Sequence, residues 1–204
     1  MQIIPGLTVI PDFVSVTGEA ALVRFVDSNP WLGGMQRRVQ HYGYVYDYKR
    51  RSVDPSMKLG NLPEWAAVIA QKMAEACWID AVPDQMIVNE YVPGQGISPH
   101  IDCEPCFGDT VLSLSLGSGC LMDLIHVESG NNSRNGKYSK YSKYDKKVSV
   151  ELPRRSLLVM RDEARYEWQH GIAARKTDVI NGRKVPRNRR LSLTFRQVVL
   201  TAVS

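Results

Sequence analysis

The chain has 204 residues, of which 44% are hydrophobic and 23% are charged, the proportions of a soluble globular domain. No stretch approaches the roughly eighteen consecutive apolar residues of a membrane-spanning helix, and the first residues lack the basic start and cleavage site of a signal peptide. Lys and Arg outnumber Asp and Glu by 26 to 21, so the net charge of +5 suits a polyanionic partner without establishing one. We therefore expect one cytoplasmic domain that is monomeric and does not enter a membrane.

Two helices are predicted in the first third of the chain. Residues 1–16 combine a short strand with Pro-Gly and Pro-Asp turns, and Thr17 is placed to cap a helix that runs to about Ser28. Pro30 and the glycines after it end this helix. A second helix begins near Pro63, because the first turn of a helix tolerates a residue without an N–H. Its apolar stripe predicts packing against a core.

Residues 37–51 are strand-like and rich in tyrosine and basic side chains. These side chains are Arg37, Arg38, Tyr42, Tyr44, Tyr46, Tyr48, Lys49, Arg50 and Arg51. A half-exposed hairpin would explain the tyrosines, because Tyr favours pleated surfaces. A basic, aromatic lip that stacks nucleic-acid bases would explain them as well. The residues alone favour the hairpin and leave the second interpretation open.

After residue 85 the pattern changes to short strands. They are predicted at 86–92, 98–102, 110–116, 120–127, 147–152, 156–160, 165–170 and 189–199. Two helices followed by this series of strands predict an α+β protein, in which a two-sheet jelly roll (a double-stranded β-helix) is flanked by the helices. We divide the single domain 1–204 into an N-terminal extension (1–85) and a jelly-roll core (86–199).

A polar insertion interrupts the predicted core at residues 129–147. Tyrosine alternates there with serine and lysine. Such a segment buries little apolar surface, so a solvated loop is the simpler interpretation. Tyrosines between lysines would also suit an arm that follows a nucleic-acid backbone.

The four cysteines are Cys77, Cys103, Cys106 and Cys120. Without a signal peptide they are expected to be reduced thiols rather than disulfides. Cys103 and Cys106 form a CxxC pair, but no second pair follows to complete a four-ligand zinc site.

A His-x-Asp pair, His100 and Asp102, lies at the end of a predicted strand. Residues i and i+2 of a strand point to the same face about 6.5 Å apart, so both side chains can bind one cation. A second His would complete the facial triad that leaves three positions open on Fe(II). His41, His126 and His170 are the candidates. Position favours His170, which ends a predicted strand and precedes a glycine.

Arg190 and Arg196 share one face of the last predicted strand with Ser192 and Thr194, and apolar residues form the other face. Two guanidinium groups on such a strand are costly unless they have partners. If the strand faced solvent or a phosphate, water or the phosphate would be the partner of these groups. A dicarboxylate ligand would too, because Arg binds carboxylates through two hydrogen bonds. Together with a facial triad, this slot indicates Fe(II) and 2-oxoglutarate.

These pieces belong to a series of motifs that covers nearly the whole chain. The series is Pro5-Gly6-Leu7, Ile10-Pro11-Asp12-Phe13, Asn89-x-Tyr91-x-Pro93-Gly94, His100-x-Asp102, Ser113-Leu114-Ser115-Leu116-Gly117, His170-Gly171-Ile172 and Arg190-x-Ser192-x-Thr194-Phe195-Arg196. In this order the motifs resemble the AlkB family of Fe(II)/2-oxoglutarate dioxygenases.

The resemblance implies roles for individual residues. His100, Asp102 and His170 would be the catalytic metal ligands, with 2-oxoglutarate and O2 as cosubstrates. The cosubstrate-binding residues would be Asn89, Tyr91 and Arg190 at the distal carboxylate, Arg196 at the carboxylate beside the keto group, and Ser192, which stands where some repair members carry Asn. Residues 37–51 would form a nucleotide-recognition lid. The substrate-binding residues would be Arg37, Tyr42, Tyr44 and Glu104, the last at a position where several DNA-repair members carry an acidic base-contacting residue.

The residues of several motifs resemble those of the branch that hydroxylates a tRNA wobble uridine. Free-standing bacterial relatives, by contrast, are generally assigned to alkylation repair. The leading expectation is oxidative dealkylation of N-alkylated bases in DNA or RNA. The alternatives are hydroxylation of a modified tRNA wobble uridine, oxidation of a protein side chain, and a non-catalytic nucleic-acid-binding module.

Overall fold

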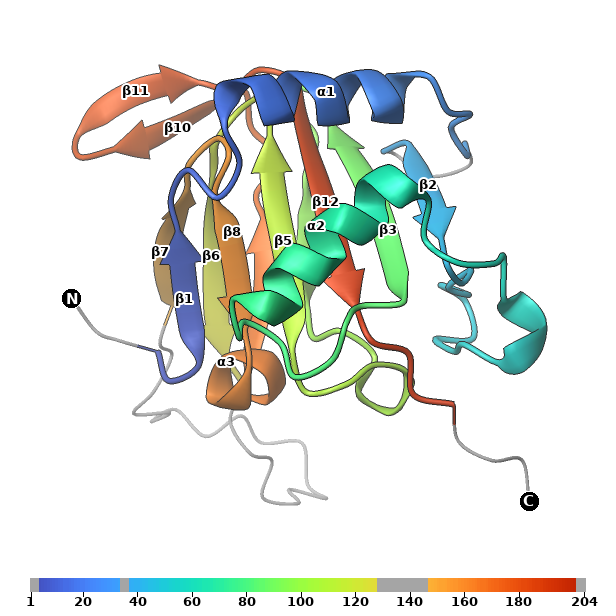
Figure 1. Ribbon diagram of the computed structural model, residues 1–204. Coiled ribbons are helices and arrows are strands. Elements are labelled where there is room, and N and C mark those ends of the chain that lie inside the picture. The colour runs from blue at the N-terminus through green and yellow to red at the C-terminus, as the bar shows by residue number, and fades with distance from the viewer. Residues whose placement is uncertain (1–3, 34–36, 128–146, 201–204) are drawn as a thin grey trace, which may run out of the picture.

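The computed structural model describes residues 4–33, 37–127 and 147–200, and Figure 1 shows their arrangement. Its strands are β1 (Leu7–Ile10), β2 (Val39–Tyr42), β3 (Gln85–Tyr91), β4 (Ile97–His100), β5 (Val111–Leu116), β6 (Cys120–His126), β7 (Lys147–Leu152), β8 (Leu157–Met160), β9 (Trp168–Ile172), β10 (Thr177–Ile180), β11 (Arg183–Pro186) and β12 (Arg190–Arg196). Its helices are α1 (Val16–Asp27), α2 (Glu64–Glu75) and α3 (Asp162–Tyr166), with 3₁₀ turns at Pro55–Met57 and Glu104–Cys106.

Two antiparallel sheets make up the body of the fold. The larger has six strands in the order β1-β8-β5-β12-β3-β2, and the smaller has four in the order β4-β9-β6-β7. Apolar side chains from both sheets meet in one core, among them Val111 and Leu158 from the larger sheet and Met122, Leu124 and Trp168 from the smaller. This architecture confirms the predicted jelly roll in an α+β chain.

The helices α1 and α2 lie over the six-stranded sheet, as the sequence predicts (Figure 1). Leu22 of α1 and Met73 of α2 are buried in a second core between the helices and this sheet. Ser15, rather than the expected Thr17, caps α1, because its hydroxyl accepts a hydrogen bond from the Gly18 N–H over 3.0 Å.

The strand β12 lies in the middle of the larger sheet, between β5 and β3, and its two faces have opposite character. Leu191, Leu193 and Phe195 belong to the core beneath the helices. The alternate residues Ser192 and Thr194 face the interior between the sheets, where they line a cavity. The alternation predicted for this strand is therefore confirmed, and it delivers polar side chains to the centre of the jelly roll.

The predicted strand at 165–170 is wrong in its first half, where the structure has the helix α3. Arg165 is buried in this helix, and its guanidinium donates hydrogen bonds to the carbonyl oxygens of Asp102 and Cys103 over 3.1 and 3.3 Å. A single helical turn shows no 3.6-residue periodicity, so the sequence pattern could not reveal it. The strand β9 follows and contains His170.

The hairpin of β10 and β11 projects beside the sheets (Figure 1) and was not predicted. Asn181 and Gly182 connect its strands with φ values of 50° and 76°. Asn-Gly is the residue pair that favours such two-residue turns, so the signal was present in the sequence. The hairpin lies within the basic stretch between Arg175 and Arg190.

Apart from Lys147, the expected polar insertion at 129–147 lies outside the described residues. In the described ranges, no helix is long and apolar enough to cross a membrane. The domain division, the monomeric state and the cytoplasmic location stay predictions.

Candidate metal and cosubstrate site

A cavity of about 570 Å³ lies between the two sheets. Its walls include His100, Asp102 and His170, the three residues predicted to bind a metal. The residues around it come from both sheets and from the tyrosine-rich segment 37–51. A cavity of this size can hold a small organic molecule beside a metal ion.

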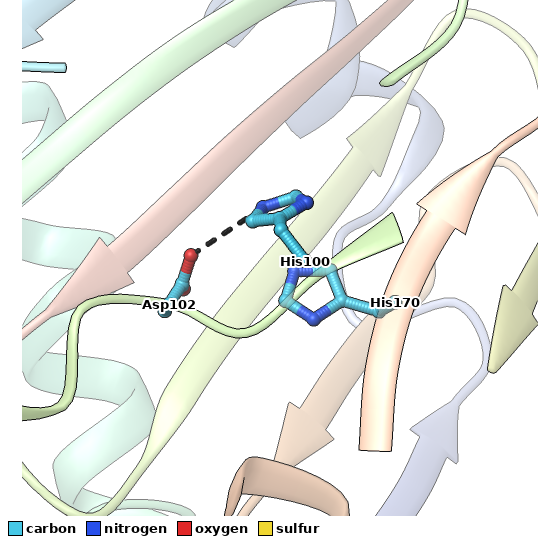
Figure 2. Close-up of side chains that lie close together, drawn as sticks. All are labelled: His100, Asp102 and His170. Atoms are coloured by element: carbon cyan, nitrogen blue, oxygen red, sulfur yellow. Dashed lines mark ion pairs between the residues drawn. The ribbon is translucent and has the colours of Figure 1, made fainter. Parts of the chain in front are cut away.

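The three predicted ligands converge, as Figure 2 shows. One potential ligand atom from each of His100, Asp102 and His170 lies within 4.8 Å of the others. The Nε2 atom of His100 lies 3.6 Å from a carboxylate oxygen of Asp102. The ring centroids of His100 and His170 lie 4.3 Å apart. Two imidazoles and one carboxylate that converge in this way are the donor set of a facial Fe(II) site.

Pairing of β4 with β9 brings the two histidines together, since His100 is the strand partner of His170. Gly171 permits this approach, because a Cβ atom there would lie only 2.8 Å from the backbone nitrogen of Pro99. The Nδ1 atom of His100 lies 2.8 Å from the carbonyl oxygen of Ser98. Nδ1 must carry the hydrogen to make this bond, which leaves Nε2 free as a metal ligand.

The protonation states of the site suit a metal. Burial by itself would raise the pKa of Asp102, but Arg196 and the two histidines outweigh it and hold that pKa below its usual range. Arg196 donates from Nε to the Asp102 carboxylate over 3.0 Å. Burial, only partly offset by Asp102, lowers the pKa of His170 to about 4. An ionised carboxylate and a neutral imidazole are the forms that bind metal.

The other two histidine candidates lie elsewhere. His126, on β6, pairs with Glu167 over 3.4 Å, and its ring packs against Trp168. The Nδ1 atom of His41 accepts a hydrogen bond from the backbone N–H of Tyr46. Among the described residues, His170 is therefore the histidine that completes the group.

Four of the five predicted cosubstrate residues, namely Asn89, Tyr91, Ser192 and Arg196, line the same cavity. The Arg196 Nη1 atom also donates to Gln85 over 3.2 Å, in addition to its bond with Asp102. The hydroxyl of Ser192 is hydrogen-bonded to Ser113 over 2.8 Å. Register explains this grouping, since Ser192 pairs with Asn89 across β12 and β3.

The guanidinium carbon of Arg190 lies over the Tyr91 ring, 5.5 Å from its centroid, and Arg190 is 3% exposed. One of its terminal nitrogens donates to Ser115 over 2.8 Å, but its Nε and other terminal nitrogen have no partner in the described part of the protein. Buried donors of a permanent cation are costly to leave without acceptors. The chemistry of this site therefore fits an anionic ligand such as a carboxylate.

The segment 37–51 meets the cavity through different tyrosines than expected. Tyr46, Tyr48 and Arg51 line the cavity, as does the predicted Arg37, whose Nε donates to Asn89 over 2.9 Å.

The predicted substrate contacts Tyr42 and Tyr44 need correction, because neither lines the cavity. Tyr42 pairs with Met86 on the helix-facing side of the sheet and packs edge-on against Trp65. Tyr44 is buried beneath Lys58. Which tyrosine faces inward depends on the register of β2 against β3, and tyrosine spacing within one segment does not reveal that register.

Glu104 also lies outside the cavity lining, exposed on the 3₁₀ turn after Asp102. The same turn joins Cys103 and Cys106 in a disulfide, with Cα atoms 5.3 Å apart. The expectation of four reduced thiols is therefore wrong for these two, while Cys77 and Cys120 are free. A disulfide also leaves no thiolates for zinc at this pair.

Comparison with known proteins places the chain in a family. A model of the 2OG-Fe(II) oxygenase superfamily matches residues 30–196. The Arabidopsis thaliana "Alkylated DNA repair protein ALKBH8 homolog" is 39% identical over 203 residues, covering 96% of this chain and 59% of the relative. The Xenopus tropicalis "tRNA (carboxymethyluridine(34)-5-O)-methyltransferase alkbh8" is 37% identical, covering 95% of this chain and 32% of the relative.

The solved structure of OsALKBH1 is similar in fold, with a TM-score of 0.68 at 21% identity, and the match covers 97% of this chain and 99% of the other. The chain thus spans about three fifths of the plant relative and about one third of the frog relative. The family match includes every strand of the two sheets except β1, and all three predicted metal ligands. The chain belongs to the 2OG-Fe(II) oxygenase superfamily and is an AlkB-like dioxygenase.

Proposed function

We propose that this dioxygenase oxidises an alkyl group on a base of DNA or RNA, and that the alkyl group leaves from a ring nitrogen. The observation that carries the proposal is the shared cavity, which is lined both by the His-Asp-His group and by the aromatic and basic side chains of residues 37–51. Relatives named for alkylated-DNA repair and for tRNA modification support a nucleic-acid substrate.

In this proposal His100, Asp102 and His170 would hold Fe(II). Bound iron and 2-oxoglutarate supply the activation of O2, coupled to decarboxylation of the cosubstrate to succinate. Two imidazoles and one carboxylate are the donor set that would hold this metal. Arg196 holds the Asp102 carboxylate in its ionised form and fixes its direction.

Arg190 would pair with the distal carboxylate of 2-oxoglutarate, because it is a buried cation with two donors that have no acceptor among the described residues. Asn89 and Tyr91 would lie beside that carboxylate. Arg196 would bind the carboxylate next to the keto group, with Ser192 between the two arginines on β12. The alternation of this strand sets the spacing of the two guanidinium groups.

Residues 37–51 would receive the nucleic acid. Tyr46 offers an aromatic face to a base turned out of its stack, Tyr48 lines the cavity beside it, and Arg37 and Arg51 suit the phosphates on either side of the base. The cavity then holds the alkyl carbon beside the metal ligands. A hydroxylated carbon on a ring nitrogen is unstable and leaves as an aldehyde, which restores the base.

A second candidate is hydroxylation of a side chain on a tRNA wobble uridine, where the hydroxyl group remains. Glu104, the expected acidic contact of a cationic methylated base, lies outside the cavity lining, whereas Arg37 and Arg51 line it in addition to the paired Arg196 and Asp102. This excess of positive charge favours a neutral or anionic base over a cationic one. The frog relative, named for a reaction on tRNA uridine 34, supports this candidate. Oxidation of a protein side chain stays a less favoured prediction.

The test is product analysis on three substrates. The enzyme with Fe(II) and 2-oxoglutarate is incubated with 1-methyladenine in single-stranded DNA, with the same base in double-stranded DNA, and with tRNA. Formaldehyde release from methylated DNA, with equal succinate formation, is the expected result. Hydroxylated uridine in tRNA without formaldehyde would select the second candidate. Substrate-independent succinate alone, unchanged in His100→Ala, would contradict the proposed site.

A further inference from the structure

His41 lies beside the cavity on β2, where it pairs with Ile87, a residue of the cavity wall. The chain then turns and brings Tyr46 and Tyr48 back over this histidine. The backbone N–H of Tyr46 lies 3.2 Å from His41 Nδ1, and the Tyr48 hydroxyl lies 3.3 Å from His41 Nε2. One imidazole therefore contacts both tyrosines of segment 37–51 that line the cavity.

The direction of these two hydrogen bonds follows from their chemistry. A backbone N–H can only donate, so Nδ1 of His41 must accept and carries no hydrogen. A neutral imidazole holds its single hydrogen on the other nitrogen, so Nε2 donates to the Tyr48 oxygen. Burial, together with the charge of Arg196, lowers the pKa of His41 to about 4, which keeps the ring neutral at pH 7.

Tyr48 is thereby an acceptor toward His41, and its own hydroxyl hydrogen points elsewhere. Among the described residues, His41 is the one hydrogen-bond partner of this hydroxyl. Tyr48 is 38% exposed and lines the cavity, so this hydrogen is available to a bound molecule. Burial raises the pKa of its phenol, so the group remains a donor at neutral pH. Its ring is held edge-on by Tyr46, with centroids 5.0 Å apart.

We propose that Tyr48 donates a hydrogen bond to a carbonyl oxygen or unprotonated ring nitrogen of the substrate base, and that His41 is a positioning residue that sets the direction of this bond. The inference rests on the proposed function, since it assigns the Tyr48 hydroxyl to a nucleobase. It adds a specificity element to that function. The site would favour bases that present an acceptor at this edge and disfavour those that present only N–H groups.

The test measures binding without turnover. The complex of enzyme, Fe(II) and 2-oxoglutarate is kept free of O2 and titrated into two labelled probes, a single-stranded oligonucleotide with 1-methyladenine and a tRNA anticodon stem-loop, and anisotropy is recorded. Tyr48→Phe should weaken binding of the preferred probe about fivefold, the effect of one lost hydrogen bond. Tyr42→Phe is the matched control, because that hydroxyl bonds Gln40 away from the cavity, and it should bind within about twofold of the wild type.

A double-mutant cycle separates positioning from general structural damage. His41→Phe should weaken binding about as much as Tyr48→Phe, and the double variant should be no weaker than either. Additive losses would overturn the inference, as would wild-type affinity in Tyr48→Phe. Nitrogen NMR of His41 gives a readout independent of the substrate, and hydrogen on Nδ1 would overturn the assigned direction. Failure of both probes to bind the wild type would instead overturn the proposed function together with the inference.

Discussion

The carboxylate of Glu90 accepts a hydrogen bond from Arg189 Nε over 2.7 Å, on the face of β3 that points away from the cavity. Its other oxygen accepts from Arg38 over 2.6 Å. Chain neighbours of these three residues are proposed to bind the cosubstrate (Asn89, Tyr91 and Arg190) or the nucleic acid (Arg37). One ion cluster outside the jelly roll therefore fixes three backbone segments that present the site inside it.

Glu90→Gln should lower the free energy of unfolding by about 2 kcal/mol. Glu90 is 5% exposed, so its loss leaves two arginines beside a buried neutral group. Chemical denaturation measures the change. Asp12→Asn is the control, because Asp12 pairs with Arg155 at the exposed surface and its removal should cost less than about 1 kcal/mol. Equal effects in the two variants would contradict the role of the cluster.

The same carboxylate predicts a pH dependence of stability. The hydrogen bond from Arg38, opposed by burial and supported by Arg189, lowers the pKa of Glu90 in the folded protein. Its stabilising contribution is therefore complete above the unfolded-state pKa of about 4.3 and is lost as the pH falls through the lower folded-state value. The difference in unfolding free energy between the wild type and Glu90→Gln should be constant from pH 7 to 5 and shrink below pH 4. A difference that grows on acidification would contradict this assignment.

The parts of the site that could be predicted depend on short-range geometry. His100 and Asp102 are two residues apart, and the polar face of β12 repeats every second residue, so both follow from strand periodicity alone. The jelly roll followed from the number and length of the strands. His170 could be favoured by position, but only the pairing of β4 with β9 shows that it meets His100.

The parts that could not be predicted depend on long-range pairing or on single turns. The register of β2 against β3 turns His41 inward and Tyr42 outward, and no local pattern states that register. The 3₁₀ turn brings Cys103 and Cys106 together, whereas the expectation of free thiols came from the cellular compartment rather than from geometry. The Asn181-Gly182 turn was the one missed feature with a clear sequence signal.

The disulfide predicts a sensitivity to reducing agents. Because it closes a short loop, its reduction should lower the free energy of unfolding by about 2 kcal/mol in the chain-entropy account. Denaturation curves with and without a reductant measure this. A variant with Cys103→Ser and Cys106→Ser should show no response, since Cys77 and Cys120 are unpaired. A wild-type curve that does not move with reductant would mean that the pair contributes nothing to stability.

Metal binding should require all three converging ligands. His100→Ala and His170→Ala should each weaken binding of Mn²⁺, a redox-inert substitute for Fe(II), by more than about a hundredfold. Calorimetric titration of the apoprotein measures the affinity. His126→Ala is the matched control, because His126, on β6, pairs with Glu167 away from the cavity, and this variant should leave the affinity unchanged. If His126→Ala weakened binding as strongly, the metal would not be at the cavity.

The unpartnered donors of Arg190 predict which end of the cosubstrate this residue recognises. Arg190→Met should raise the KM for 2-oxoglutarate about a hundredfold, because charged hydrogen bonds worth about 3 kcal/mol are lost. The KM for 2-oxobutyrate, which lacks the distal carboxylate, should be raised by at most about threefold in the same variant. Arg183→Met, on the exposed strand β11, is the control for the loss of one positive charge. Succinate or propionate formation measures each reaction. A similar loss with both cosubstrates would show that Arg190 supports the fold of β12 rather than the distal carboxylate.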